Sequence, residues 1–377
     1  MQETKGIFPE MVLTLQSSFM AGMSFVLAAS LVPVLRVPAL RLGLVDKPCH
    51  RKRHNGAVPL TGGLAVFIAF LAALLFDMGD LANYLGLLVG MCVLLVVGVL
   101  DDLVDLRAML KLLIQVVVAL AVVVLSDFQI NHLGPLFGPA FGNVGLGPFA
   151  VPFTVLCMVF MVNVINMADG VDGLAGGIGV IVLAMLATVG FLSGAPLALS
   201  TLCLVLATAV AGFLVWNMRF PFRERAAAFM GDAGSMMLGF AIAWLAIAMA
   251  THEGSSVYPI SIAWILLIPC MDTLALTIRR ISRGRSPMAP DRTHLHHIIQ
   301  RCHFSVTATV GIIHFMVLLT GLFGVIAWQM GLPQWILFAL AAGMMVGYTG
   351  LLLVAHRLIR WRTRKLRYSS PELRRVG

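Results

Sequence analysis

Residues 83–100 read NYLGLLVGMCVLLVVGVL and run directly into DDLVDLR at residues 101–107. A helix that crosses a bilayer needs about 20 mostly apolar residues, and this stretch has that character. Similar stretches follow one another along the 377-residue chain, which is 60% hydrophobic and only 11% charged. Soluble domains carry about 25% charged residues, so this composition excludes a water-soluble globule. The sequence therefore predicts an all-α, polytopic helical membrane protein.

Clusters of charged, Pro and Gly residues divide the apolar sequence into eleven predicted transmembrane helices. They cover residues 11–35, 61–77, 83–100, 111–126, 149–166, 173–192, 197–217, 233–251, 257–277, 306–329 and 333–355. We expect a single integral-membrane domain over residues 1–377, with its core at about 35–360 and a basic tail at 357–377.

The basic residues test this count, because cytoplasmic loops carry an excess of Lys and Arg. With eleven spans, all but one of the 26 Lys and Arg residues fall on one side, and Lys5 is the exception. The N-terminus is then expected in the periplasm and the C-terminus in the cytoplasm. The net charge of +9 is therefore mainly a topology signal, and no motif predicts nucleic-acid binding.

Acidic residues gather on the same side as the basic ones. They come from four separate loops, and several stand at the ends of apolar spans: Asp101, Asp102, Asp105, Asp169, Asp172, Asp232 and Asp291. One such carboxylate would more often be a solvated boundary residue, but seven on one side of the membrane favour a functional site. If residues 101–105 are helical, Asp101 and Asp105 share a face. Three acids in five residues repel each other unless a cation or base neutralises them, which favours Mg²⁺ or proton handling.

Two further motifs lie at the ends of predicted helices. Asn163 and Asn166 stand inside an apolar span, and Asp169 continues their three-residue spacing. Amides in lipid are costly, so these side chains should face a polar cavity. Asp232 and Ser235 open the eighth span within FMGDAGS, where a simple helix cap would explain both of them.

Two loops carry the cations. Residues 290–297 read PDRTHLHH, and three histidines beside Arg292 favour phosphate contact or acid–base chemistry over a zinc site. Residues 42–63 hold Lys47, the basic run 51–54 and a pair of glycines at the start of the second span. Such a run next to a membrane is also typical of a topology signal or of contact with anionic lipid. Acids suited to Mg²⁺ and cations suited to phosphates on one face predict Mg²⁺-assisted phosphoryl transfer at the cytosolic interface.

In this order, these blocks resemble the polyprenyl-phosphate N-acetylhexosamine-1-phosphate transferase superfamily. The resemblance rests on the Asp pair at 101–102, the block 163–173, MGDAGS at 230–235 and the His loop, and it extends over about 35–360. VDKP at 45–48, RKRH at 51–54 and residues 286–297 look most like the bacterial undecaprenyl-phosphate N-acetylglucosamine-1-phosphate transferases, which begin O-antigen and enterobacterial common antigen synthesis. Their His-Ile-His-His loop reads His-Leu-His-His here.

The resemblance implies that undecaprenyl phosphate attacks UDP-N-acetylglucosamine, releasing UMP and leaving a lipid-linked sugar pyrophosphate in the membrane. It implies a Mg²⁺ cofactor, with Mn²⁺ as a substitute, held by Asp232 and Asn166. The expected catalytic residues are Asp101, Asp102, Asp105, His294, His296 and His297. The expected substrate-binding residues are Lys47, Asn163, Asp169, Asp172 and Arg292. A phosphate with a second pKa of about 6 needs little help from a base, so direct attack is favoured over an aspartyl-phosphate intermediate.

The resemblance also implies a location and a set of partners. We expect a multi-pass protein of the bacterial inner membrane with its active site facing the cytoplasm, bound by membrane lipid and able to form a homodimer. A phospho-N-acetylmuramoyl-pentapeptide transferase, or a transferase of another UDP-N-acetylhexosamine, is the alternative within the superfamily. A secondary transporter is a remote alternative, since it should show internal repeats and polar residues at the midplane. Asp272 receives no role from the sequence.

Overall fold

The computed structural model describes residues 4–46, 57–77, 81–126, 129–286 and 293–369, and almost all of its regular structure is helical. The helices are α1 (Thr4–Leu42), α2 (Gly62–Asp77), α3 (Leu85–Val104), α4 (Ala108–Leu125), α5 (Ala150–Ala168), α6 (Leu174–Ser193), α7 (Leu197–Asn217), α8 (Gly231–Thr251), α9 (Pro259–Ile265), α10 (Leu267–Ile281), α11 (Leu295–Arg301), α12 (Val306–Gln329) and α13 (Gln334–Ser369). Two short strands, β1 (Val45–Asp46) and β2 (Val58–Pro59), form an antiparallel pair. The predicted all-α architecture is confirmed.

Each of the eleven predicted spans coincides with a helix or with a pair of helices. Among the described residues, nine helices are long and apolar enough to cross a membrane, and α2 is a shorter apolar helix. The predicted ninth span is wrong as a single helix, because α9 and α10 meet at an angle of 85°. Pro269 follows the break; it has no N–H to donate to the Ile265 carbonyl, and its ring crowds that group. The number of crossings and the orientation of the termini stay predictions.

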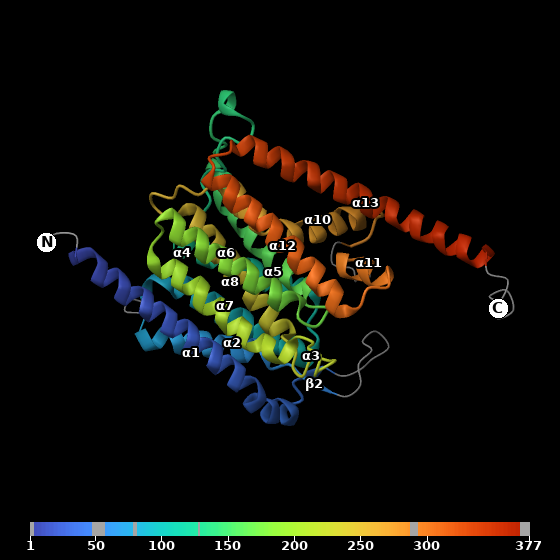
Figure 1. Cartoon of the computed structure of the whole chain (residues 1–377), viewed down its shortest axis with the longest axis horizontal. Helices are drawn as coiled ribbons and strands as arrows, with labels where there is room; N and C mark the ends of the chain where they lie inside the picture. The colour runs from blue at the N-terminus through green and yellow to red at the C-terminus, as the bar shows by residue number, and fades with distance from the viewer. Residues whose placement is uncertain (1–3, 47–56, 78–80, 127–128, 287–292, 370–377) are drawn as a thin grey trace.

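Helix α8 is the core of the bundle, with 94% of its most apolar segment buried inside the protein. Helices α2, α3, α5 and α6 all pack against it (Figure 1). Small residues make the closest contacts: Gly98 lies against the backbone of Ala233, and Gly63 lies against Gly234. Helices in lipid associate by such close approach, because the surrounding solvent is itself apolar. The start of α8 is thereby held tightly between α2 and α3.

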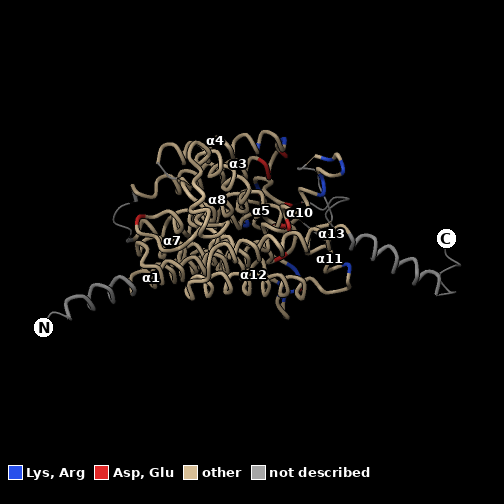
Figure 2. The backbone as a smooth tube through the Cα atoms, turned by 90° about the horizontal axis from the view of Figure 1, so that it is seen from above, with Lys and Arg blue, Asp and Glu red and all other residues tan. Residues whose placement is uncertain are grey.

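The loops that carry charge meet at one end of this bundle. Phe229 donates its N–H to the Pro59 carbonyl at 3.0 Å and accepts from the Gly62 N–H at 3.0 Å, which ties β2 to the segment before α8. Figure 2 shows the described Lys, Arg and most of the acidic residues at this same end. Helix α1 begins at one end of the bundle and α13 ends at the other (Figure 1). The predicted convergence of the acidic loops is confirmed for the residues that the structure describes.

Candidate active site

The site is built around the first turn of α8, and Asp102 fixes that turn from the end of α3. The Asp102 carboxylate accepts the backbone N–H of Asp232 at 3.0 Å and of Ala233 at 3.3 Å. These N–H groups have no partner inside their own helix, and a negative charge at a helix start is favourable. Gly231 has a φ of +74°, and a Cβ there would lie 2.6 Å from the Asp102 carboxylate. Asp102 thus caps α8, and only glycine fits at position 231.

One cation joins two carboxylates from different helices. The Lys111 ammonium, on α4, lies 2.6 Å from Asp101 Oδ2 and 3.3 Å from Asp232 Oδ2. The Asp101 side chain is only 3% exposed, whereas that of Asp232 is 36% exposed. Asp101 also accepts the Leu106 N–H at 2.8 Å through its other oxygen. Asp101 is therefore a buried anchor, and Asp232 is the carboxylate that a ligand can reach.

Helix α5 orients the exposed carboxylate. Asn166 donates through Nδ2 to Asp232 Oδ1 at 2.9 Å and to Ser235 Oγ at 2.9 Å. Ser235 is fully buried and donates to the Gly231 carbonyl. The two residues expected to hold Mg²⁺ thus lie in hydrogen-bond contact, with Asn166 as the donor, and their role as metal ligands stays a prediction. The helix cap that would explain Asp232 is instead supplied by Asp102.

The other predicted asparagine has a different environment. Asn163 donates to Gln115 Oε1 at 2.7 Å and to the Val159 carbonyl at 2.8 Å. Gln115 is buried on α4 and points its own amide at Met236 Sδ, 3.4 Å away. These contacts place Asn163 in a polar link between α4 and α5, one turn deeper than Asn166.

The expectation that Asp105 shares a helix face with Asp101 is wrong. Helix α3 ends at Val104, and Asp105 is its C-cap, with a left-handed φ of 53°. The Asp105 N–H donates to the Asp101 carbonyl at 2.8 Å, while the residue itself is exposed. The chain turns away here because Asp101 uses its own carboxylate to accept the next N–H, from Leu106. Asp105 therefore lies outside the helix, exposed, and does not share a helix face with Asp101.

Two more predicted acids lie in the turn between α5 and α6. Asp169 is the half-buried C-cap of α5. Asp172 accepts from Arg219 Nε at 2.8 Å and from the Ala226 N–H at 3.3 Å, so it joins this turn to the loop before α8. The sequence indicated Arg219 only as one of the basic residues of the predicted cytoplasmic loops, and its contact with Asp172 is seen only in the structure.

The three loop histidines occupy different environments. His294 is buried and lies 3.0 Å from Asp272 Oδ2 through Nδ1, while His296 and His297 follow on α11 with ring centroids 4.2 Å apart. Burial lowers the pKa of His296 to about 3, and the charges of His297 and His294 act in the same direction. His296 Nε2 lies 3.5 Å from where a Cβ of Gly170 would stand. The histidines and the Asp232 cluster therefore flank the same turn after α5.

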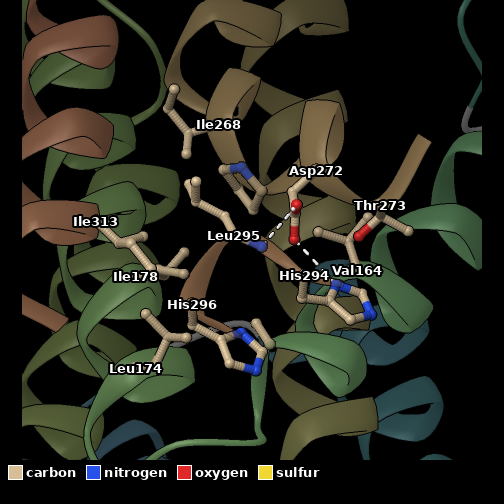
Figure 3. A pocket seen from close by; sticks show the side chains of 12 residues that line it. Val164, Leu174, Ile178, Ile268, Asp272, Thr273, His294, Leu295, His296 and Ile313 are labelled. Atoms are coloured by element: carbon tan, nitrogen blue, oxygen red, sulfur yellow. Dashed lines mark hydrogen bonds and ion pairs between the residues drawn. The ribbon is translucent and has the colours of Figure 1, made fainter. Parts of the chain in front are cut away.

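A cavity continues from these histidines into the bundle (Figure 3). Its lining comes from α5, α6, α10, α11 and α12 and is mostly apolar, and its polar members are Asp272, Thr273, His294 and His296. Two predicted site residues, Lys47 and Arg292, lie outside the described residues, as does Asp291.

Sequence reasoning missed Lys111, Gln115 and Asp272 as members of the site. Lys111 was visible as a cation that begins an apolar span ten residues after Asp101, and Gln115 and Asp272 as polar residues within apolar spans. Nothing in the linear order indicated which acids they would meet, because their partners come from other helices.

The carboxylates beside Lys111 are the described groups that bear on binding of a divalent cation. No group of three or more His, Cys, Asp or Glu residues that could hold a metal is found among the residues the structure describes. Asp101 and Asp232 nevertheless direct two carboxylate oxygens at a single positive charge, the Lys111 ammonium. Mg²⁺ in enzymes uses one or two carboxylates, several waters and substrate phosphates. Asp232, the more exposed of the two carboxylates, can therefore receive Mg²⁺ together with waters and a phosphate ligand.

Comparisons with known proteins identify the family of the chain. Residues 84–250 match the model of a family described as glycosyl transferase family 4. Three relatives carry the name undecaprenyl-phosphate alpha-N-acetylglucosaminyl 1-phosphate transferase. The protein of Pasteurella multocida is 31% identical over 91% of this chain and 95% of its own length. That of Yersinia pestis is 32% identical over 86% and 88%, and that of Haemophilus influenzae is 30% identical over 91% and 96%.

Proposed function

The chain belongs to glycosyl transferase family 4, and from this membership we propose that it transfers N-acetylglucosamine 1-phosphate from UDP-N-acetylglucosamine to undecaprenyl phosphate. The observation that carries the proposal is the name shared by relatives that match at least 86% of this chain. The cation-bridged carboxylates at one end of an apolar bundle support it, because two anionic phosphates must meet there.

The reaction can be written as a direct displacement. An oxygen of the lipid phosphate bonds to the phosphorus that carries the sugar. The bond from that phosphorus to the bridging oxygen breaks, and UMP leaves with this oxygen. No proton has to be removed from a phosphate that is already ionised near pH 7. The protein's main task is then to neutralise and align two anions.

Residues around α8 fit this task. The Lys111 side chain is 22% exposed, and its ammonium can contact a phosphate oxygen from its place between the two carboxylates. Asn166 holds Asp232 in a single orientation, and the Asp102 cap keeps the helix start in place. We place the donor pyrophosphate beside His296 and His297, across the turn at Gly170 from the Asp232 cluster. A neutral His296 can donate one hydrogen bond to an anion without carrying a proton into the site.

Mg²⁺, held by Asp232, the carboxylate that a ligand can reach, would supply positive charge where the phosphates meet and neutralise the developing charge. Mn²⁺ would serve as a substitute. The carboxylates lie at the charged end of the bundle, so we place the reaction at the cytoplasmic face of the bacterial inner membrane. Undecaprenyl phosphate would approach from the lipid and the nucleotide sugar from water. The product would then prime a surface polysaccharide of the O-antigen type.

A reconstituted assay tests the proposal. Purified protein in lipid is given undecaprenyl phosphate, Mg²⁺ and one of several UDP-sugars, and the release of UMP is measured. We expect turnover with UDP-N-acetylglucosamine and none without the lipid acceptor. Faster turnover with UDP-N-acetylmuramoyl-pentapeptide or with UDP-N-acetylgalactosamine would overturn the assignment of the donor.

Asp232→Asn is the variant that tests the site in the same assay. It keeps the shape of the side chain and removes the reachable charge, so we expect a loss of about 10²–10³-fold in rate. Glu253→Gln, at an exposed position on the loop after α8, is the matched control and should retain the wild-type rate. Wild-type turnover of Asp232→Asn at limiting Mg²⁺ would exclude Asp232 as a metal ligand.

A further inference from the structure

Asp272 is an acidic residue that accepts several hydrogen bonds and has no part in the proposed chemistry. It lies on α10, six residues after the break that separates this helix from α9. Its carboxylate meets three donors, one from α13 and two from the start of α11. Tyr348 on α13 donates its hydroxyl at 2.5 Å, the Leu295 N–H donates at 3.0 Å, and His294 Nδ1 lies 3.0 Å away. The side chain is only 15% exposed, so these groups satisfy a buried charge.

The surroundings of His294 define its tautomer. The carboxylate of Asp272 can only accept, so the proton of the imidazole lies on Nδ1. The second ring nitrogen, Nε2, faces Arg280 Nη2 at 3.5 Å, and a guanidinium can only donate. Both nitrogens of His294 are therefore directed at groups of the protein.

The same carboxylate sets the start of α11. Leu295 is the first residue of this helix, and its N–H would have no partner without Asp272. His296 and His297 follow directly, so the start of the helix determines the direction in which they point. Figure 3 shows Asp272 holding His294 and Leu295 while the His296 ring lies on another side of the cavity. His296 reaches the turn at Gly170, next to the Asp232 cluster.

We propose that Asp272 is a positioning residue that holds His294 as its Nδ1–H tautomer and fixes the start of α11, so that His296 and His297 face the donor while His294 does not touch it. This inference rests on the proposed function, since it assigns parts within the donor site. It divides the three histidines into one that belongs to the scaffold and two that meet the substrate.

Substitutions at His294 separate the two roles. His294→Gln offers an amide N–H to Asp272 and a carbonyl oxygen to Arg280, so it reproduces both contacts of the tautomer. We expect it to keep kcat and the KM for UDP-N-acetylglucosamine within about threefold of wild type. His294→Leu reproduces neither contact and should lose about 10–100-fold in kcat/KM, the usual effect of losing an orienting partner. Equal losses in the two variants would overturn the proposal, because they would show that the imidazole itself acts on the substrate.

Asp272→Asn tests the carboxylate. Its amide group places a donor against His294 Nδ1–H and favours the other tautomer, whose Nε2–H would face Arg280. We expect a similar 10–100-fold loss in kcat/KM, with the KM for the donor raised and the KM for undecaprenyl phosphate unchanged. Tyr348→Phe removes one donor to Asp272 but leaves His294 and Leu295 in place, and it is the matched control that should stay within about threefold.

Protein yield and melting temperature are measured on the same preparations. Loss of melting temperature without loss of donor KM or kcat in Asp272→Asn would reduce its role to packing and overturn the proposal. If Asp272→Asn does not fold, the comparison of His294→Gln with His294→Leu decides. Absence of UMP release from the wild-type protein with every UDP-sugar would instead reject the proposed function. An active wild-type protein whose two His294 variants fall equally would reject this inference alone.

Discussion

Lys111 stabilises the arrangement of two carboxylates that would otherwise repel each other across the start of α8. It lies in the first turn of α4, and its ammonium contacts Asp101 and Asp232 within 3.3 Å. Asp101 is nearly inaccessible to water, so its charge needs a partner inside the protein. In the sequence Lys111 is one of many basic residues that flank a predicted span. In the structure it belongs to the site.

Replacement of Lys111 by Gln should therefore affect both stability and rate. Hydrogen bonds to charged groups contribute about 1.5–3 kcal/mol each, so we expect a lower melting temperature in Mg²⁺-free buffer. In Mg²⁺-containing buffer we expect a large loss of turnover. Added Mg²⁺ should raise the melting temperature of this variant more than that of wild type, because the carboxylate pair has lost the cation it shares. Arg107→Gln, at an exposed position in the same loop, is the control. A melting temperature and rate equal to wild type would contradict the assignment.

His296 gives the molecule a predictable response to acid. Burial lowers its pKa to about 3 from the ordinary value of 6.5. Between these two values the unfolded chain binds a proton that the folded chain does not, so stability is present above about pH 6.5 and falls as the pH falls towards 3. Acidification from pH 7 to pH 5 should cost up to about 2 kcal/mol through this residue.

His296→Gln removes this titration and keeps a neutral polar side chain. We expect the melting temperature of wild type to fall more between pH 7 and pH 5 than that of His296→Gln, measured in the same detergent. His303→Asn, at an exposed position after α11, should leave the wild-type slope unchanged. Equal slopes for wild type and His296→Gln would show that this imidazole is not held neutral by burial.

At the scale of the elements, the contact between α3 and α8 aligns the carboxylates. Gly98, one turn before Asp102, lies against the backbone of Ala233, and a Cβ there would also come within 2.7 Å of the Asp232 carbonyl carbon. A backbone cannot move aside as a flexible side chain can. The two helices that present Asp101, Asp102 and Asp232 therefore depend on a glycine at this crossing.

Gly98→Ala should separate the two helices and weaken the cap that Asp102 gives to α8. Overpacking of this kind costs about 1–3 kcal/mol, and we expect a lower melting temperature together with a reduced kcat. Gly22→Ala, at a helical position with no atom within 4 Å of the added Cβ, is the matched control and should change neither quantity. Unaltered turnover in Gly98→Ala would show that the alignment of the carboxylates does not depend on this contact.

At the scale of the whole molecule, the charged loops lie together at one end of the bundle. Whether that end faces the cytoplasm or the periplasm can be tested. Cys302 is exposed in the loop after α11, while Glu253 is exposed beyond the opposite end of α8. The positive-inside rule places the first in the cytoplasm and the second in the periplasm.

Thiol labelling tests this orientation. In a Cys49→Ser background, an impermeant reagent should leave Cys302 unlabelled in intact cells with a permeabilised outer membrane and should label it in inverted vesicles. Glu253→Cys, in a background that also carries Cys302→Ser, should show the reverse pattern. Labelling of Cys302 from the outside would overturn the orientation and place the site in the periplasm.

Much of this architecture follows from the sequence because its physical cause is local. Each of the eleven predicted apolar stretches has a counterpart in α1–α10, α12 and α13, since a helix that satisfies its own backbone is the stable form of such a stretch in lipid. The grouping of Asp101, Asp169 and Asp232 at one end follows in the same way, from the alternation of loops between two sides.

Only the tertiary structure decides what each of these residues does. The cap from Asp102 to α8, the sharing of Lys111 by Asp101 and Asp232, and the hold of Asp272 on His294 all join residues of different helices. Asp105, predicted to share the face of Asp101, leaves it because the chain turns at the end of α3. Hydropathy and charge place a residue at a depth and on a side of the membrane, because they depend on the chain's own composition. The contacts that each side chain makes depend on which helices pack together and on how each helix is rotated. That packing is determined by the close fit of small residues distant in sequence, such as Gly63 against Gly234.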